Sequence, residues 1–205
     1  KFEYKKVKRF ILYHISHKIM EDVIYFDKCG DHTEEVLEFC KKYAEANNIR
    51  DIVVASTTGK TGLRFSEVFK GYNLVVVTHC AGFREPGRLE LNEDYRRAIE
   101  ENGGKVLVAT HALSGVERAF RKKFDTIGPV EIIANALKCF GEGTKVCVEI
   151  SLMAADAGLI PVDKDIISVA GTGRGADTAL LIRPAYSMNF FDLRVRKVLC
   201  KPVDF

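Results

Sequence analysis

Four short apolar segments constrain the fold of this chain more than any other feature. They are DIVVAS (51–56), NLVVVT (73–78), KVLVAT (105–110) and DIISVAG (165–171). An uninterrupted apolar strand is typical of a sheet that is covered on both faces. Helical stripes of apolar residues separate the first three segments at the spacing of β–α–β units. The sequence therefore predicts a mostly parallel sheet between two layers of helices.

Other segments complete the predicted order of elements. Residues 178–185 follow the Gly-rich turn TGRGAD with no helical stripe, so we expect a strand antiparallel to 165–171. VIYF (23–26) predicts a short first strand, and VRKVLC (195–200) predicts an edge strand. Residues 144–159 alternate partly like a strand, but a shared apolar face favours a helix. That face holds Val146, Ile150, Met153 and Ala157.

Helix starts can be predicted from capping residues. Asp31 and Glu34 have the spacing of a capping box, and their helix should stop at Asn47-Asn48. Asn92 and Ser114 each precede a helical pattern as caps, and Pro129 fits the first helical position.

The beginning of the chain differs from the rest in charge. Residues 1–18 carry six Lys or Arg side chains against Glu3 alone, so the formal net charge of +3 leaves −2 for the remainder. The short apolar run in this segment is interrupted by His14 and His17, which argues against a signal peptide. We interpret residues 1–19 as an N-terminal basic extension and 20–205 as a single domain.

Composition excludes several classes of function. The body has no basic stripe with interleaved aromatic residues, which argues against nucleic-acid binding. No apolar run approaches the roughly 20 residues that span a membrane. The six cysteines form no CxxC pair and do not cluster with histidines, so we expect reduced thiols, a cytoplasmic protein and no metal site. They are Cys29, Cys40, Cys80, Cys139, Cys147 and Cys200.

The turn STTGKTG, directly after the first long apolar segment, predicts a phosphate site. It is not a P-loop, because Val54 stands where the consensus needs glycine and no acidic strand end offers a magnesium partner. A helix N-terminus still provides free backbone N–H groups and the positive end of the helix dipole. The alternative is an ordinary capped strand-to-helix turn. The candidate phosphate-binding residues are Ser56, Thr57, Thr58, Gly59, Lys60 and Thr61.

Three more turns should lie at the same edge of the sheet, because ligands gather where parallel strands end. The Gly-rich turn AGTGRGAD is not a dinucleotide fingerprint, since its third glycine comes one residue early and no helix follows. It can still present N–H groups to a ligand, although a glycine-demanding turn is the alternative. The other turns follow 73–78 and 105–110. The candidate residues are Gly171, Thr172, Gly173, Arg174, Gly175, Asp177, His79, Gly82, His111, Ser114 and Gly115.

Three acidic residues are further candidates. Glu149 and Asp156 lie in an otherwise apolar segment at a seven-residue spacing, so an ion pair or a ligand contact could explain them. Glu117 follows His111 on the next helical pattern. A Ser114–His nucleophile pair lacks an evident third group that would orient the histidine.

Together, these segments resemble a known family. The strand–STTGKTG–helix unit resembles the effector loop of the pyruvate kinase C-terminal domain, and VAGTGRGADTALLIRP is similar to its late Gly-rich hairpin. From about Met20 to Pro202 the chain is more similar to stand-alone archaeal and bacterial proteins of the pyruvate kinase alpha/beta domain-like group. The matching pieces include TEEVLEF, HALSGVERAF, KVCVEISLMAADAGLIP, GTGRGADTALLIRPA and NFFD.

The resemblance implies a three-layer α/β/α sandwich, with a mostly parallel core sheet of about five strands whose last strand is antiparallel. It implies no established enzymatic role, and these residues hold no match to the catalytic barrel of pyruvate kinase. It suggests flavin mononucleotide (FMN) as the cofactor. The chain departs from the family pattern at Lys60, where many kinases have Arg, and at Gly62, where a residue such as Ala is expected.

The leading hypothesis is therefore a protein that binds a small phosphorylated ligand, with FMN as the first candidate. The rival is a flavin-dependent or phosphosugar-acting enzyme, whose proton donors would be His79, His111, Glu117 or Asp156. A third hypothesis is a regulatory or assembly module, which leaves a homo-oligomer open.

Overall fold

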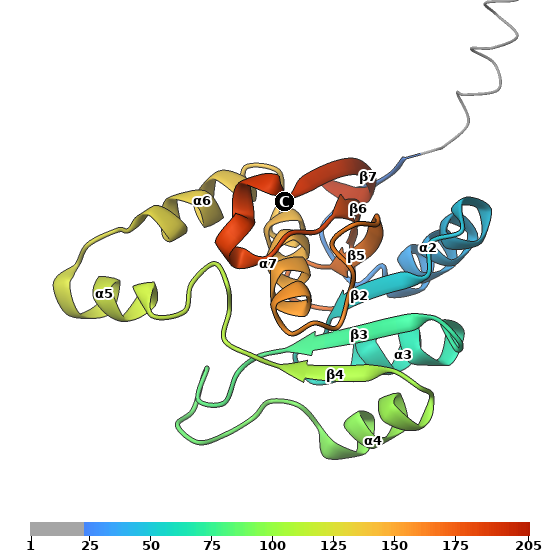
Figure 1. Cartoon of the computed structure of the whole chain (residues 1–205), viewed down its shortest axis with the longest axis horizontal. Helices are drawn as coiled ribbons and strands as arrows, with labels where there is room; N and C mark the ends of the chain where they lie inside the picture. The colour runs from blue at the N-terminus through green and yellow to red at the C-terminus, as the bar shows by residue number, and fades with distance from the viewer. Residues whose placement is uncertain (1–22) are drawn as a thin grey trace, which may run out of the picture.

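The computed structural model of this chain describes residues 23–205, so the predicted extension at 1–19 lies outside the described residues. A seven-stranded sheet runs through the molecule in the order β1-β7-β6-β5-β2-β3-β4 (Figure 1). Its strands are β1 (Ile24–Lys28), β2 (Asp51–Ala55), β3 (Asn73–Thr78), β4 (Lys105–Val108), β5 (Ile166–Ala170), β6 (Thr178–Arg183) and β7 (Arg194–Asp204). The helices are α2 (Thr33–Asn47), α3 (Lys60–Val68), α4 (Glu93–Glu101), α5 (Glu117–Phe124), α6 (Pro129–Lys138), α7 (Glu142–Asp156) and the 3-10 helix η1 (Ser187–Asp192).

Helices cover both faces of the sheet, which confirms the predicted three-layer α/β/α sandwich. Successive residues of a strand point to opposite faces. Ile52 and Val54 accordingly pack against α2 and α3, whereas Val53 packs against α7. The apolar strands β2, β3 and β5 are thus buried on both sides, as the sequence indicates. The same prediction is wrong for β4, which lies at the edge of the sheet and is only partly buried.

The parallel part of the sheet consists of β5, β2, β3 and β4. The prediction that 178–185 forms an antiparallel strand is confirmed, since β6 pairs antiparallel with β5. The predicted helix at 144–159 is also confirmed, as α7. Its central position explains its weak amphipathic pattern, because residues around most of its circumference are buried.

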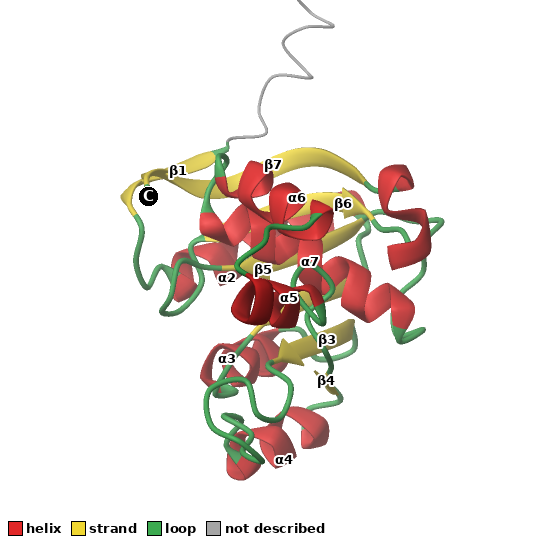
Figure 2. Cartoon of the chain, turned by 90° about the vertical axis from the view of Figure 1, so that its left-hand side faces the viewer, coloured by secondary structure: helices red, strands yellow, loops and turns green. Residues whose placement is uncertain are grey.

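The prediction of an edge strand at 195–200 is wrong. β7 pairs antiparallel with β6 on one side and parallel with β1 on the other, as Figure 2 shows at one end of the sheet. The short strand β1 takes the edge instead. The sheet therefore consists of the predicted five-stranded core (β6, β5, β2, β3 and β4) and two further strands, β7 and β1.

Two of the predicted helix caps are also wrong. The residue before α2 is His32, and Asp31 accepts hydrogen bonds from Thr33 instead. α5 begins at Glu117, too far along the chain for the Ser114 side chain to cap it. The prediction for Asn92 is confirmed, because its side chain accepts from the backbone of Asp94 and Tyr95. α6 starts with Pro129 as expected.

All six cysteines are free thiols. Cys40, Cys147 and Cys200 are buried as expected, whereas Cys29 and Cys139 are exposed. Within residues 23–205 no helix has the length and apolar character needed to cross a membrane.

Candidate functional site

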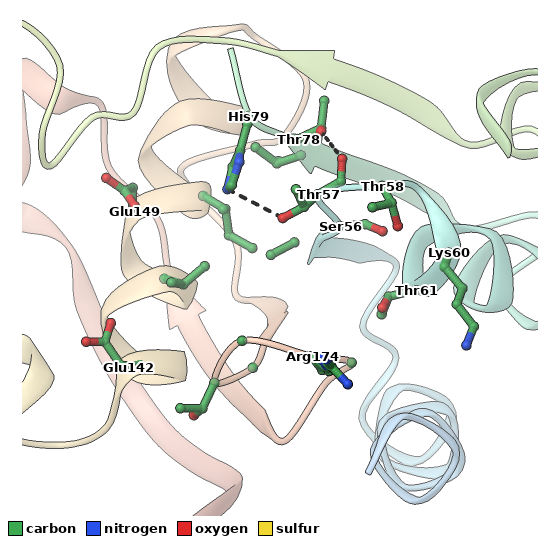
Figure 3. A pocket seen from close by; sticks show the side chains of 18 of the residues that line it. Ser56, Thr57, Thr58, Lys60, Thr61, Thr78, His79, Glu142, Glu149 and Arg174 are labelled. Atoms are coloured by element: carbon green, nitrogen blue, oxygen red, sulfur yellow. Dashed lines mark hydrogen bonds between the residues drawn. The ribbon is translucent and has the colours of Figure 1, made fainter. Parts of the chain in front are cut away.

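A cleft of about 1150 Å³ opens where β2, β3 and β5 end (Figure 3). Turns far apart in the sequence line it together with α2, α3 and α7. Of the predicted site residues, it is lined by Ser56, Thr57, Thr58, Lys60, Thr61, His79, His111, Gly171, Thr172, Gly173, Arg174 and Gly175. Five others do not line it: Gly59, Gly82, Ser114, Gly115 and Asp177.

The 56–61 turn is held from behind by hydrogen bonds. The Oγ of Ser56 accepts from the backbone N of Gly62 at 3.0 Å, which closes the first turn of α3. The carbonyl of Thr57 accepts from Thr78 Oγ1 at 2.8 Å, and that of Thr58 accepts from the N of Asn92 at 3.0 Å. Because the carbonyls of Thr57 and Thr58 accept hydrogen bonds from β3 and from the residue before α4, these bonds hold the turn in place at the cleft.

Gly59 supports this turn without lining the cleft. It has a φ of +96°, a conformation that favours glycine. A Cβ at this position would lie 2.8 Å from the Cβ of Tyr95. Gly59 is therefore required by the backbone geometry and by packing against α4.

The Gly-rich hairpin between β5 and β6 forms the facing wall. Asp177 is fully buried and accepts from Thr172 N at 3.0 Å and from Thr178 Oγ1 at 2.7 Å. Asp177 is therefore a structural clamp that shapes the hairpin. The hairpin also docks on the start of α2, since Ala176 N donates to Thr33 Oγ1 at 2.9 Å.

Thr172 carries the unusual atom of this hairpin. Its Oγ1 is the buried side-chain polar atom that lacks a hydrogen-bond partner in the described part of the chain. A buried hydroxyl without a partner is costly and calls for an explanation. Thr172 lines the cleft, so a bound ligand could supply the missing hydrogen bond.

Three rings gather at another part of the cleft. The centroid of His79 lies 4.1 Å from that of Phe83 and 5.0 Å from that of His111, and Phe83 lies 4.8 Å from His111. The guanidinium of Arg118 lies over Phe83 at 4.8 Å. The two histidines predicted to share one rim are thus in contact.

His79 has a partner that the sequence did not indicate. Its Nδ1 lies 2.6 Å from Oε2 of Glu90, and its Nε2 lies 3.4 Å from Oγ1 of Thr57. Arg84 Nε contacts the other oxygen of Glu90 at 3.0 Å. Glu90 lies in the segment REPGRLELNE, which has no periodic pattern to distinguish one acidic residue from another.

The buried carboxylate of Glu149 acts electrostatically on His111. Only 1% of the Glu149 side chain is exposed, and it accepts from Leu113 N at 2.9 Å and pairs with Lys145. Burial lowers the pKa of His111, and this effect outweighs the Glu149 charge, which raises it. Of the two explanations open for Glu149, the structure shows the ion pair with Lys145. The pair lies in the cleft wall, so a ligand contact stays open as well.

Glu117 and Asp156 do not belong to the cleft. Glu117 accepts hydrogen bonds from the first backbone N–H groups of α6, at Val130 and Glu131. Asp156 accepts from Ser187 and ties α7 to η1. Both carboxylates are used structurally, so their expected role as proton donors to a ligand is wrong. Ser114 lines a smaller cavity of about 140 Å³ beside Glu117.

Most charges of the cleft are paired. Arg64 pairs with Glu34 and Glu67, Lys138 with Glu142, and Lys145 with Glu149. Among the described residues, Lys60, Arg118 and Arg174 line the cleft without an ion-pair partner. No group of three or more His, Cys, Asp and Glu residues within 23–205 could hold a metal ion.

The fold and the cleft define a class of protein: a three-layer α/β domain with a ligand-sized cleft at the carboxyl ends of its parallel strands. The family described as "Pyruvate kinase, alpha/beta domain" matches residues 34–182. The chain belongs to this family.

Two solved structures that are partly similar to this chain belong to longer proteins. Pyruvate kinase from Cryptosporidium parvum, in complex with ADP, is 17% identical and has a TM-score of 0.38, over 83% of this chain and 26% of that chain. The NH3-dependent NAD synthetase from Campylobacter jejuni is 14% identical and has a TM-score of 0.36, over 67% of this chain and 53% of that chain. This chain thus spans about a quarter of the pyruvate kinase.

Proposed function

We propose that the cleft binds a small phosphorylated ligand, with its terminal phosphate on the 56–61 turn and FMN as the first candidate. One observation carries the proposal: a helix N-terminus with the unpaired cation Lys60 shares a cleft with Thr172, whose buried hydroxyl lacks a partner. Arg174, on the same hairpin as Thr172, adds a second unpaired cation.

A phosphate suits these groups because each can donate to it. The N-terminal backbone N–H groups of α3 have no acceptor within the helix, and the helix dipole favours an anion there. Thr58 and Thr61 add hydroxyl donors, and Figure 3 shows both on the turn beside Lys60. Each hydrogen bond to a charged phosphate contributes about 1.5–3 kcal/mol.

The rest of the cleft suits a planar ring system. Cavities that enclose a whole small-molecule ligand measure about 300–1,000 Å³, so 1150 Å³ leaves ample room beyond a phosphate. The rings of His79, Phe83 and His111 offer stacking partners, and Arg118 places a cation next to them. FMN combines one phosphate with one large planar ring.

Paired binding measurements test this proposal. Thr58→Ala combined with Lys60→Ala should weaken FMN far more than riboflavin, because riboflavin lacks the phosphate. We expect a loss of about 10-fold or more for FMN, since at least one charge-assisted hydrogen bond is removed. Quenching of flavin fluorescence measures both affinities. Lys70→Ala, an exposed lysine outside the cleft, is the matched control.

Two outcomes would contradict the proposal. Wild-type protein that binds neither added FMN nor any other phosphomonoester has no such site. Equal losses for FMN and riboflavin would place the phosphate elsewhere in the cleft.

A further inference from the structure

His79 contacts both Thr57 and Glu90, and these two contacts are compatible with a chemical reaction in the cleft as well as with ligand binding. A hydroxyl, an imidazole and a carboxylate lie in series, with 3.4 Å between the first pair and 2.6 Å between the second. This is the arrangement in which a base activates a nucleophile and a third group orients the base. We propose that the protein hydrolyses the phosphomonoester that it binds, with Thr57 as nucleophile and His79 as general base. This inference rests on the proposed function.

The fold positions all three groups. Thr57 lies on the turn between β2 and α3, and His79 directly follows β3, the parallel neighbour of β2. The register pairs Ala55 with Val77, so the two turns leave the sheet side by side. Figure 3 shows the side chain of Thr57 directed toward His79.

Glu90 lies on the loop between β3 and α4, and this loop folds back so that Glu90 contacts His79. The backbone N of Gly82 donates to the carbonyl of Arg88 at 3.0 Å, which closes this loop. Arg84 holds the second oxygen of Glu90, so the carboxylate is fixed at both ends. The side chains of His79 and Glu90 are only 22% and 18% exposed, which limits competition from water.

These contacts select the tautomer of the neutral ring that a base needs. Glu90 accepts the proton of Nδ1, so Nε2 keeps a lone pair toward the Thr57 hydroxyl. The 3.4 Å distance is long for this hydrogen bond. Such contacts are often long without substrate and shorten in the substrate complex. Phe83 and His111 pack against the ring and keep it in place.

The position of Thr57 selects the substrate class. Its hydroxyl belongs to the same turn that is proposed to hold the phosphate, so the phosphorus atom is the electrophile nearest to it. The backbone N–H groups of α3 and the Lys60 amine would stabilise the charge on the phosphoryl oxygens. These donors are fixed before the reaction, because the turn is held from behind.

The proposed reaction has two balanced steps. In the first, Thr57 Oγ1 bonds to phosphorus and its proton moves to His79 Nε2. The bond from phosphorus to the ester oxygen breaks, and the proton on His79 passes to the leaving alcohol. In the second, water attacks the phosphothreonine, His79 accepts a proton from this water, and the same proton returns to Thr57 as its bond to phosphorus breaks. The net products are an alcohol and inorganic phosphate.

Steady-state kinetics with p-nitrophenyl phosphate and with FMN test this inference. Released nitrophenol and inorganic phosphate are measured for wild type and for Thr57→Val, Thr57→Ser, His79→Gln and Glu90→Gln. We expect Thr57→Val and His79→Gln to lower kcat by about 100-fold or more. Thr57→Ser, which keeps the hydroxyl, should retain most of the activity. His32→Gln removes a histidine that does not line the cleft and is the matched control.

Glu90 acts through His79 as a positioning residue, and this role has its own readout. Glu90→Gln should lower kcat and leave KM nearly unchanged, because the substrate contacts remain. A change in KM alone would show that Glu90 only supports the shape of the loop, which would contradict its assigned role.

Binding and turnover separate this inference from the proposed function. Wild-type protein that binds FMN but releases no phosphate from either substrate would overturn the hydrolysis and leave the binding proposal intact. Thr57→Val with the kcat of wild type would overturn the role of Thr57. Protein that neither binds nor hydrolyses a phosphomonoester would overturn both proposals.

Discussion

His111 gives the protein a pH dependence of stability. Burial lowers its pKa, with smaller contributions in the same direction from His79, Lys145 and Arg118 and an opposing one from Glu149. In the unfolded chain the imidazole returns to its ordinary pKa of about 6.5. As the pH falls through that value, the unfolded state takes up a proton before the folded state does. The free energy of unfolding should therefore decrease.

The variant His111→Gln isolates this effect. Because it has no titrating ring, it should lose less stability than wild type between about pH 8 and pH 5. Urea denaturation at a series of pH values measures the free energy of unfolding of both proteins. In the difference between them, the contributions of the other titrating groups largely cancel. A difference that stays constant with pH, or that grows in favour of wild type on acidification, would contradict the assigned environment of His111.

Single residues show where sequence analysis reaches its limit. The hydroxyl-rich turn and both histidines could be predicted, because they follow recognisable strands. Glu90 could not, because it meets His79 only through the path of an irregular loop. Gly62 departs from the family pattern for a packing reason: a Cβ there would lie 2.5 Å from Val76 Cγ1. Such a distance depends on how closely α3 lies on β3.

At the scale of elements, α5 and α6 depend on each other. Figure 1 shows both helices projecting from the same side of the sheet, and α5 has no buried residue. Two contacts link them. The Glu117 carboxylate accepts from Val130 N and Glu131 N at the start of α6, and Arg121 pairs with Glu131 at 2.7 Å. A carboxylate at a helix N-terminus satisfies free donors and interacts favourably with the dipole.

Glu117→Ala should therefore destabilise α6. Loss of a capping interaction costs about 1–2 kcal/mol, which corresponds to roughly 5–30-fold faster exchange of protected amides. Hydrogen exchange followed by mass spectrometry should show the increase in α6 and little change in α7. Glu101→Ala, at an exposed position of α4, is the matched control. Unchanged protection of α6 would show that the cap contributes nothing to its stability.

Strands could be predicted where their own residues are apolar. Their place in the sheet could not be predicted where it depends on pairing with a strand far away in the sequence. The four apolar segments became β2, β3, β4 and β5. Three of them are buried on both faces, which gives a strand an apolar pattern of its own, whereas β4 is a partly buried edge strand. The charged residues of β7 are typical of an exposed edge strand. It is interior only because β1 pairs with it, a contact between the two ends of the described chain.

At the scale of the whole molecule, the cleft spans two parts of the chain. The 56–61 turn and the histidines follow β2, β3 and β4, whereas the Gly-rich hairpin and the Glu149–Lys145 pair belong to the later part of the sequence. These parts meet where β2 pairs with β5. A ligand that contacts both walls adds interactions that only the folded chain can make.

Ligand binding should therefore raise the melting temperature. A ligand that binds only the folded state at 100 times its Kd stabilises it by about 2.7 kcal/mol, which corresponds to about 5–10 °C for a domain of this size. Differential scanning fluorimetry or calorimetry with FMN measures the shift. The Thr58→Ala, Lys60→Ala double variant should lose most of it. Riboflavin should give a smaller shift in wild type, since it lacks the phosphate that is proposed to bind the 56–61 turn. An equal shift for both ligands, or for both proteins, would mean that the ring alone provides the stabilisation and that the turn between β2 and α3 holds no phosphate.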